Sequence, residues 1–131
     1  MSEIDIMRAM QVAASQAGNR LFRNNTAVGW VGQLAGRPAG GTVVLKNARV
    51  LHAGLCVGSS DLIGWTRVLI TPEMVGQVKA IFNATEAKSA IGRPTPEQIQ
   101  FINAVRASGG LAGIARTIEQ MQGIANGHIH D

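Results

Sequence analysis

Residues 95–115 read TPEQIQFINAVRASGGLAGIA, and they predict a helix that passes into a strand. Thr95 is a favoured N-cap residue, and Pro96 suits the first helical position because its missing N–H would be unpaired there anyway. Gln98 stands where the side chain that completes a capping box is expected. This stretch therefore predicts a helix that begins at Pro96.

Apolar residues continue this helix at a spacing that places them on one face. We expect a buried stripe made by Ile99, Ile102 and Val105, with Phe101 beside them. The pair Gly109-Gly110 predicts the end of the helix, and Leu111 to Ala115 predicts a strand. A second capped helix is expected to start at Thr117-Ile118-Glu119-Gln120.

The first third of the chain predicts one more helix and several strands. Helical spacing of apolar residues and the stop signal Gly18-Asn19 predict a helix over residues 3–17. Residues 20–25 and 27–31 read as strands of a hairpin-like opening. The run GQLAGRPAGG, residues 32–41, has four glycines and a proline, which is typical of a mobile surface loop.

Strand-like segments fill the middle of the chain. They cover residues 42–57, residues 61–70 and residues 78–88, and Thr71-Pro72-Glu73 predicts a turn or a short helix start between the last two. The order of helices and strands predicts an α/β fold in which helices flank a central mixed β-sheet. The length of 131 residues suits a single domain.

The charges are distributed unevenly. Lys and Arg number 12 against 8 Asp and Glu, which gives a formal net charge of +4. No acidic residue occurs from Ile6 to Ser60, although six cations do: Arg8, Arg20, Arg23, Arg37, Lys46 and Arg49. Such an excess of cations favours a polyanionic partner.

Several classes of protein are excluded or disfavoured. The longest run without a charged residue has thirteen residues, Asn24 to Gly36, whereas a bilayer span needs about 20 apolar residues. The first ten residues, MSEIDIMRAM, have no apolar segment of the kind that a secretory signal needs. The single Cys56 can form no intramolecular disulfide and offers no zinc framework, so we expect a reducing, cytoplasmic setting.

Glu86-Ala87-Lys88 is the first candidate for chemistry. On a strand, residues i and i+2 point to the same face about 6.6 Å apart, so a carboxylate and an ammonium group would lie side by side. Carboxylate oxygens suit a hard divalent cation, and a lysine can stabilise phosphoryl charge. In a chain of this composition, roughly 0.7 pairs of an acidic residue two positions before a basic one are expected by chance. The simpler alternative is a surface ion pair that contributes little to stability.

Asp61 strengthens the metal hypothesis. It follows the turn-prone Gly58-Ser59-Ser60 and begins an apolar segment, where a carboxylate has no packing role. Two neighbouring strands could bring Asp61 and Glu86 to one cation. The alternative is that Asp61 only ends a turn.

Three blocks of sequence together resemble a known family. They are FRNNTAVGWVG (22–32), GLCVGSSDLIGW (54–65) and ATEAKSAIGRPTPEQIQFINAVRASGGLAGIAR (84–116). In this order and spacing they resemble the virus-type replication-repair nuclease (VRR-NUC) domain, a branch of the PD-(D/E)XK nuclease superfamily. The resemblance covers roughly residues 3–116 and implies a restriction-endonuclease-like core.

The resemblance also implies roles for individual residues. Asp61 and Glu86 would bind Mg²⁺ or Mn²⁺, together with the backbone carbonyl of Ala87 and with Glu3 from the first helix. Lys88 would assist attack on the phosphodiester, and Gln98 matches an active-site glutamine. The chain departs from the family pattern in having Ser60 where proline usually precedes the aspartate, and in the small side chains of Thr85 and Ala87 around Glu86.

Other residues have a functional and a structural interpretation. Arg20, Arg23 and Arg93 are candidates for phosphate contacts, with ordinary surface solvation as the alternative. Trp30 and Trp65 could stack on bases, although tryptophans in apolar strands are more often core residues, and Cys56 is expected to be buried. The metal-ligand types of His128 to Asp131 are expected to lie in a disordered tail.

The resulting expectation is a Mg²⁺- or Mn²⁺-dependent DNA endonuclease. Stand-alone relatives of this size come largely from phages and prophages, which implies DNA replication or repair. A homodimer that cuts branched DNA such as a Holliday junction is the preferred refinement. The alternatives are a catalytically inactive DNA-binding accessory protein and a protein that assembles with other proteins.

Overall fold

The computed structural model describes residues 2–127 of the chain. The chain divides into two compact units, Met1–Gly64 and Trp65–Asp131. The single domain expected from the sequence stays a prediction. Within residues 2–127, no helix is long and apolar enough to cross a lipid bilayer.

The first unit opens with helix α1 (Glu3–Gln16), which confirms the helix expected there. Ser2 caps it: its Oγ accepts a hydrogen bond from the Asp5 backbone N–H at 3.2 Å, and the Asp5 carboxylate accepts one from the Ser2 N–H at 3.3 Å. This reciprocal capping box satisfies backbone donors that a helix start otherwise leaves unpaired. The chain leaves the helix through Gly18 at φ +82°, a backbone conformation that favours glycine.

Strand β1 (Arg20–Arg23) follows α1 and pairs with β4 (Leu62–Trp65). The Gln11 side chain of α1 donates a hydrogen bond to the Leu21 carbonyl at 3.1 Å, which ties helix to strand. Gly64 allows the two strands to approach, because a Cβ there would overlap the Arg20 carbonyl. The expected hairpin of residues 20–25 with 27–31 is therefore wrong, since the first of these segments takes a partner forty residues away.

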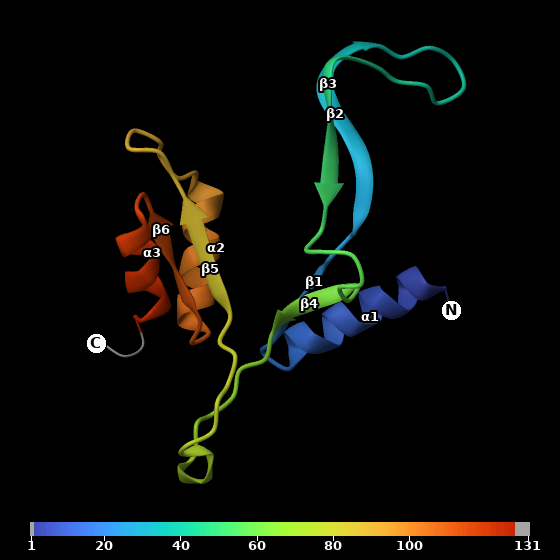
Figure 1. Cartoon of the computed structure of the whole chain (residues 1–131). Coiled ribbons are helices and arrows are strands. Elements are labelled where there is room, and N and C mark those ends of the chain that lie inside the picture. Colours follow the sequence, from blue (N-terminus) through green and yellow to red (C-terminus); the bar gives the residue numbers. More distant parts are fainter. Residues whose placement is uncertain (1, 128–131) are drawn as a thin grey trace. The chain divides into compact units, whose positions relative to one another are not determined.

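Strands β2 (Ala27–Gly36) and β3 (Val44–Ala53) form an antiparallel ribbon, drawn in blue to green in Figure 1. The loop expected at residues 32–41 is shorter than predicted, because β2 continues through Gly32 to Gly36. Gly32 lies against the opposite strand, where a Cβ would stand 2.7 Å from the Lys46 carbonyl oxygen. That glycine permits a close cross-strand approach and does not mark a loop.

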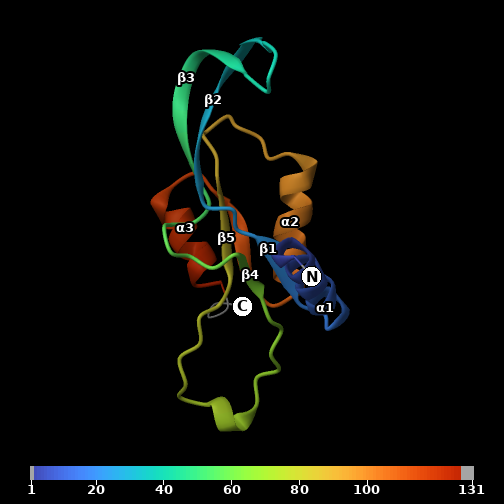
Figure 2. The same cartoon turned by 90° about the vertical axis from the view of Figure 1, so that its right-hand side faces the viewer.

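The second unit is built on a β-α-β arrangement. Strands β5 (Asn83–Ala87) and β6 (Leu111–Ala115) are parallel, with Asn83 opposite Leu111 and Ala87 opposite Ala115, and helix α2 (Pro96–Ala107) connects them. Helix α3 (Ile118–Ala125) follows β6. Figure 1 and Figure 2 place α2 on one side of the strand pair and α3 on the other. A parallel pair needs such a crossover and cover on both faces.

The core of this unit lies between α2 and the strand pair. Val105 and Ile102 of α2 are 1% and 6% exposed and pack with Ala112 of β6. Gly110, between α2 and β6, lets the chain pass close to the Val105 side chain. A Cβ at this position would stand only 2.7 Å from Val105 Cγ1. The predicted stripe is narrower than expected, since Ile99 is half-exposed, as is Phe101.

Partly buried side chains surround this core. They are Trp65, Phe82, Ala84 and Ile114. The Trp65 ring lies 5.0 Å from that of Phe82 and 6.3 Å from that of Phe101, centroid to centroid. Trp65 is therefore partly buried against the core, which agrees with the structural interpretation in direction.

The α/β composition is confirmed, but the sheet differs from the expectation. Residues 2–127 form three separate two-stranded sheets, β1 with β4, β2 with β3, and β5 with β6, where one central mixed sheet was expected. The strand expected at 78–88 begins only at Asn83, where β6 supplies hydrogen-bond partners. Val78, upstream, is 96% exposed. The short helix start expected near Thr71 is present as the 3-10 helix η1 (Pro72–Met74).

Candidate functional site

Glu86, Lys88 and Gln98 meet at the carboxyl end of β5. Glu86 Oε1 accepts a hydrogen bond from Gln98 Nε2 at 2.8 Å and lies 3.2 Å from Lys88 Nζ. The Lys88 side chain is 18% exposed and that of Glu86 is 31% exposed, so both are reachable from solvent. The structure thus brings together three of the four residues predicted to be catalytic.

Backbone pairing explains why Glu86 and Lys88 share a face. The Lys88 N–H donates to the Ala115 carbonyl at 3.1 Å, which extends the β5–β6 ladder one residue beyond β5. The alternation of a strand therefore holds at Lys88, and residues two apart point the same way. The Arg116 side chain donates to the Ser89 carbonyl, and this contact holds the chain just after the cluster.

Gln98 connects the cluster to the start of α2. Its Oε1 accepts a hydrogen bond from the Thr95 N–H at 2.9 Å, while its own N–H donates to Thr95 Oγ1 at 3.2 Å, so the predicted capping box is confirmed. The other end of the same amide, Nε2, donates to Glu86. One side chain therefore caps the helix and orients the carboxylate. The positive end of the α2 dipole lies beside that negative charge, a favourable arrangement.

A cavity of about 360 Å³ opens between β5 and α2 beside this cluster. Its lining combines polar and apolar side chains, namely Ala84, Thr85, Glu86, Glu97, Gln98, Phe101 and Ile102. Glu97 is a second carboxylate on this wall that sequence reasoning missed. The sequence did contain a feature that could have revealed Glu97: it lies in the first turn of the predicted helix, directly before the candidate Gln98.

In this unit, Glu86 can supply one carboxylate ligand to a hard divalent cation. Both contacts of Glu86 are made to Oε1. Glu97 lines the same cavity, and the carbonyl of Ala87 belongs to the last residue of β5. Within the described residues of this unit, however, no group of three or more His, Cys, Asp or Glu residues is arranged to hold a metal ion.

Asp61, the fourth predicted catalytic residue, belongs to the first unit and is exposed just before β4. Its backbone carbonyl accepts a hydrogen bond from the Asn24 N–H at 2.9 Å. The Asn24 side chain also donates to Ser59 Oγ at 2.7 Å and to the Ser60 carbonyl at 2.9 Å, and it accepts from the Leu55 N–H at 3.0 Å. Asn24 therefore organises the turn that presents Asp61.

Asn24 was not singled out from the sequence. An asparagine at the end of a short strand is a common turn residue, and its partners lie more than thirty positions away. Local sequence signals therefore could not reveal its role.

The remaining predicted residues lie in varied settings. Glu3 is the exposed first residue of α1. The side chains of Arg20 and Arg23 donate to Asn19 O at 3.2 Å and to Asn25 Oδ1 at 2.9 Å, and Arg93 is exposed before α2. The prediction for His128 to Asp131 lies outside the described residues.

Two expectations about burial are wrong. Cys56 is exposed, in the turn after β3. Trp30 is 67% exposed, because it lies on a two-stranded ribbon and not in the core that its apolar neighbours suggested.

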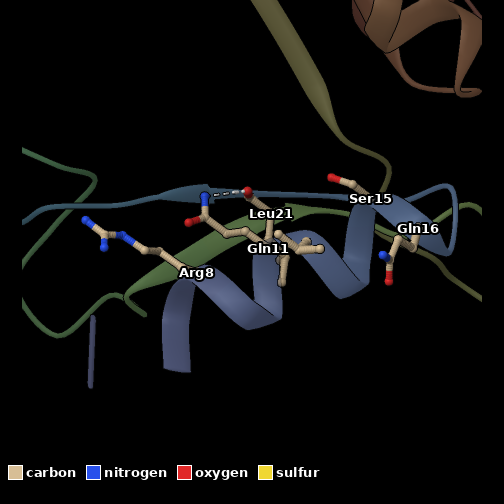
Figure 3. A pocket seen from close by; sticks show the side chains of 6 residues that line it. Arg8, Gln11, Ser15, Gln16 and Leu21 are labelled. Atoms are coloured by element: carbon tan, nitrogen blue, oxygen red, sulfur yellow. Dashed lines mark hydrogen bonds between the residues drawn. The ribbon is translucent and has the colours of Figure 1, made fainter. Parts of the chain in front are cut away.

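An open depression between α1 and β1 is the other concavity of note (Figure 3). It is lined by Arg8, Gln11, Val12, Ser15, Gln16 and Leu21. Gln11 uses its amide to bond the Leu21 carbonyl, as the dashed line in Figure 3 marks. The side chains that line the depression include no carboxylate.

Comparison of the chain with known protein families, curated proteins and solved structures found no match.

Proposed function

We propose that this protein is a metal-dependent DNA endonuclease that hydrolyses phosphodiester bonds. The observation that supports it best is the position of Glu86 Oε1, between Lys88 Nζ at 3.2 Å and Gln98 Nε2 at 2.8 Å on the wall of a cavity. A carboxylate, an ammonium group and an amide in contact can serve metal binding, charge stabilisation and orientation in phosphodiester hydrolysis.

Each residue has a role in this proposal. Glu86 would hold Mg²⁺ or Mn²⁺ through its carboxylate, and the cation would supply Lewis acidity and activate a water nucleophile. Lys88 stabilises the negative charge that develops on the phosphate, and Gln98 keeps the Glu86 carboxylate oriented. Asp61, in the first unit, is a sequence-based prediction for a second ligand and is tested separately.

The net charge of +4 and the absence of acids from residue 6 to 60 support a polyanionic substrate. The resemblance to VRR-NUC domains adds branched DNA such as a Holliday junction, a homodimer, and a phage or prophage role in DNA replication or repair. A bacterial cytoplasm is the setting that goes with that role.

A catalytically inactive DNA-binding accessory protein is the second candidate. One observation favours it: among the described residues of either unit taken alone, no three His, Cys, Asp or Glu side chains gather to hold a metal ion. Glu86 and Lys88 would then be a partly exposed ion pair, which contributes at most about 1 kcal/mol to stability.

The deciding experiment incubates labelled branched and linear DNA with the protein in Mg²⁺, in Mn²⁺ or in chelator, beside Glu86→Gln, Lys88→Ala and Asp61→Asn. Lys79→Ala, an exposed lysine of the same unit, is the matched control for Lys88→Ala. Metal-dependent cutting that Glu86→Gln and Lys88→Ala abolish, and that Lys79→Ala keeps, is the expected result.

Salt-sensitive binding without cutting in either metal would favour the accessory protein. If the protein neither binds nor cuts DNA, both candidates are overturned. A monomeric mass in solution, together with equal cutting of linear and branched DNA, would overturn the branched-DNA refinement.

A further inference from the structure

The ribbon of β2 and β3 has two chemically different faces. Direct partners in an antiparallel pair point to the same side, as do residues two apart. Val31 pairs with Arg49 and Gln33 pairs with Lys46, so these four residues lie on one side together with Leu51, and this side is here called the cationic face. Val28, Trp30, Leu34 and Val50 occupy the other side, the apolar face, which also has His52 opposite Val28.

An irregularity in β3 keeps both cations on the cationic face. Arg49 and Lys46 are three residues apart, which in a regular strand would place them on opposite faces. The register shifts between Val31 and Gln33, where Asn47 adopts φ +51°. The extra residue restores the alternation, as a β-bulge does. The bulge therefore aligns two cations that the sequence spacing alone would separate.

The charges of this face have no counterpart nearby. Lys46 and Arg49 are exposed, and so is Arg37 in the turn after β2. Among residues 2–127, none of the three takes part in an ion pair, and the ribbon contains no acidic residue. Gln33 and Asn47 stand beside the cations, and the Asn47 amide donates to Gln33 Oε1 at 3.4 Å.

We infer that the cationic face of the β2–β3 ribbon is a docking surface for double-helical DNA. A two-stranded ribbon fits the major groove of B-DNA, and lysine and arginine neutralise phosphates there. Ten residues of strand span about 33 Å, close to one helical turn of duplex. Gln33 and Asn47 are amides of the type that can reach base edges.

The inference goes beyond the proposed nuclease site, which lies in the second unit. It rests on the proposed DNA substrate but not on cutting, so binding is measured in chelator. The variant carries Lys46→Gln and Arg49→Gln together. The matched control carries Arg67→Gln and Lys79→Gln, which remove the same two charges from exposed positions of the second unit. A third variant, Lys46→Arg with Arg49→Lys, keeps both charges.

Binding of a labelled duplex is followed over a series of salt concentrations. The ribbon variant is expected to bind about tenfold more weakly, and its slope of log affinity against log salt should fall by about 1.8, since each phosphate contact contributes about 0.9. The control and the charge-preserving variant should keep the slope of the unaltered protein. Equal thermal midpoints exclude misfolding as the cause.

Three outcomes would overturn the inference. The first is an unchanged slope in the ribbon variant while Glu86→Gln still loses cutting, which would leave the nuclease proposal standing. A second is binding of the ribbon to phosphatidylserine vesicles but not to duplex. The third is absence of any DNA binding by the unaltered protein, which would overturn both proposals. If the ribbon variant loses salt slope as expected but the unaltered protein cuts no DNA, only the nuclease proposal is overturned.

Discussion

The two units of this chain use their apolar residues differently. In the first, Met7 is the one buried apolar side chain among residues 2–64, and Trp30 and Val28 are each 67% exposed on the ribbon. In the second, Val105 and Ile102 pack against β6 under a parallel strand pair. A parallel pair joined by a helix buries apolar surface within one short segment, whereas an isolated ribbon cannot.

The spacing of the acidic residues also differs between the units. Within residues 2–127 the first unit has Glu3, Asp5 and Asp61, none of them between residues 6 and 60, while the second has Glu73, Glu86, Glu97 and Glu119. Each unit has six Lys and Arg residues, so the units differ in the long acid-free stretch of the first and not in the number of cations. The predictions compare the packing and the proposed chemistry of the two units.

The largest effect is expected on cutting. Glu86→Gln should lower the rate of metal-dependent DNA cleavage by about 10³-fold, because it removes a charged ligand while keeping the size of the side chain. Asp61→Asn should cause a similar loss if the first unit supplies the second ligand. The measurement is single-turnover cleavage of a labelled junction in Mg²⁺. Full activity of Asp61→Asn would confine the chemistry to the second unit.

A smaller effect is expected on the core of the second unit. Val105→Ala removes two carbons from a side chain that is 1% exposed, and should lower the free energy of unfolding by about 2 kcal/mol. Urea denaturation followed by far-UV circular dichroism measures it. An unchanged denaturation midpoint would contradict the description of Val105 as the centre of this core.

Gln98 should affect both stability and activity. Gln98→Ala removes the capping bond to Thr95 and is expected to cost about 1 kcal/mol of unfolding free energy. Gln98→Glu keeps an acceptor for the Thr95 N–H but sets a second carboxylate against Glu86, so it should lose cutting, and the repulsion between the two carboxylates should offset the stability that the retained cap provides. Equal activity of Gln98→Glu and the unaltered protein would show that the bond to Glu86 has no role in the chemistry.

The smallest effect is expected on the ribbon. Val28→Ala makes the same chemical change as Val105→Ala, but at a side chain that is 67% exposed, and should change the unfolding free energy by less than about 0.5 kcal/mol. The same denaturation experiment compares the two variants directly. A loss as large as that of Val105→Ala would mean that the ribbon is covered in solution.

The sequence predicted best where local signals are sufficient. The capping box of Thr95 and Gln98, the start of α3 at Thr117 and the strand from Leu111 to Ala115 were all predicted and are confirmed. Each depends on hydrogen bonds or alternation within a few residues. The proximity of Glu86 and Lys88 follows for the same reason, since strand geometry fixes it.

Predictions failed where a partner distant in sequence decides the structure. β1 pairs with β4 and not with the next strand, and Asn24 bonds the turn at Ser59 and Ser60. Gly32 was interpreted as part of a loop because a glycine in a strand and a glycine in a loop look alike until the opposite strand is known. Tertiary structure decides which segments pair with a strand or cover it, and rules based on short sequence spacings cannot predict this.

The two tryptophans give the molecule a pair of spectroscopic reporters. The chain has no tyrosine, so Trp30 and Trp65 dominate its near-ultraviolet absorption and its fluorescence. Trp30 is exposed on the ribbon, whereas Trp65 packs against Phe82 and Phe101. A water-soluble quencher should therefore extinguish the emission of Trp30 first. With Trp30→Phe and Trp65→Phe, the melting of each region can be followed separately and without an added dye.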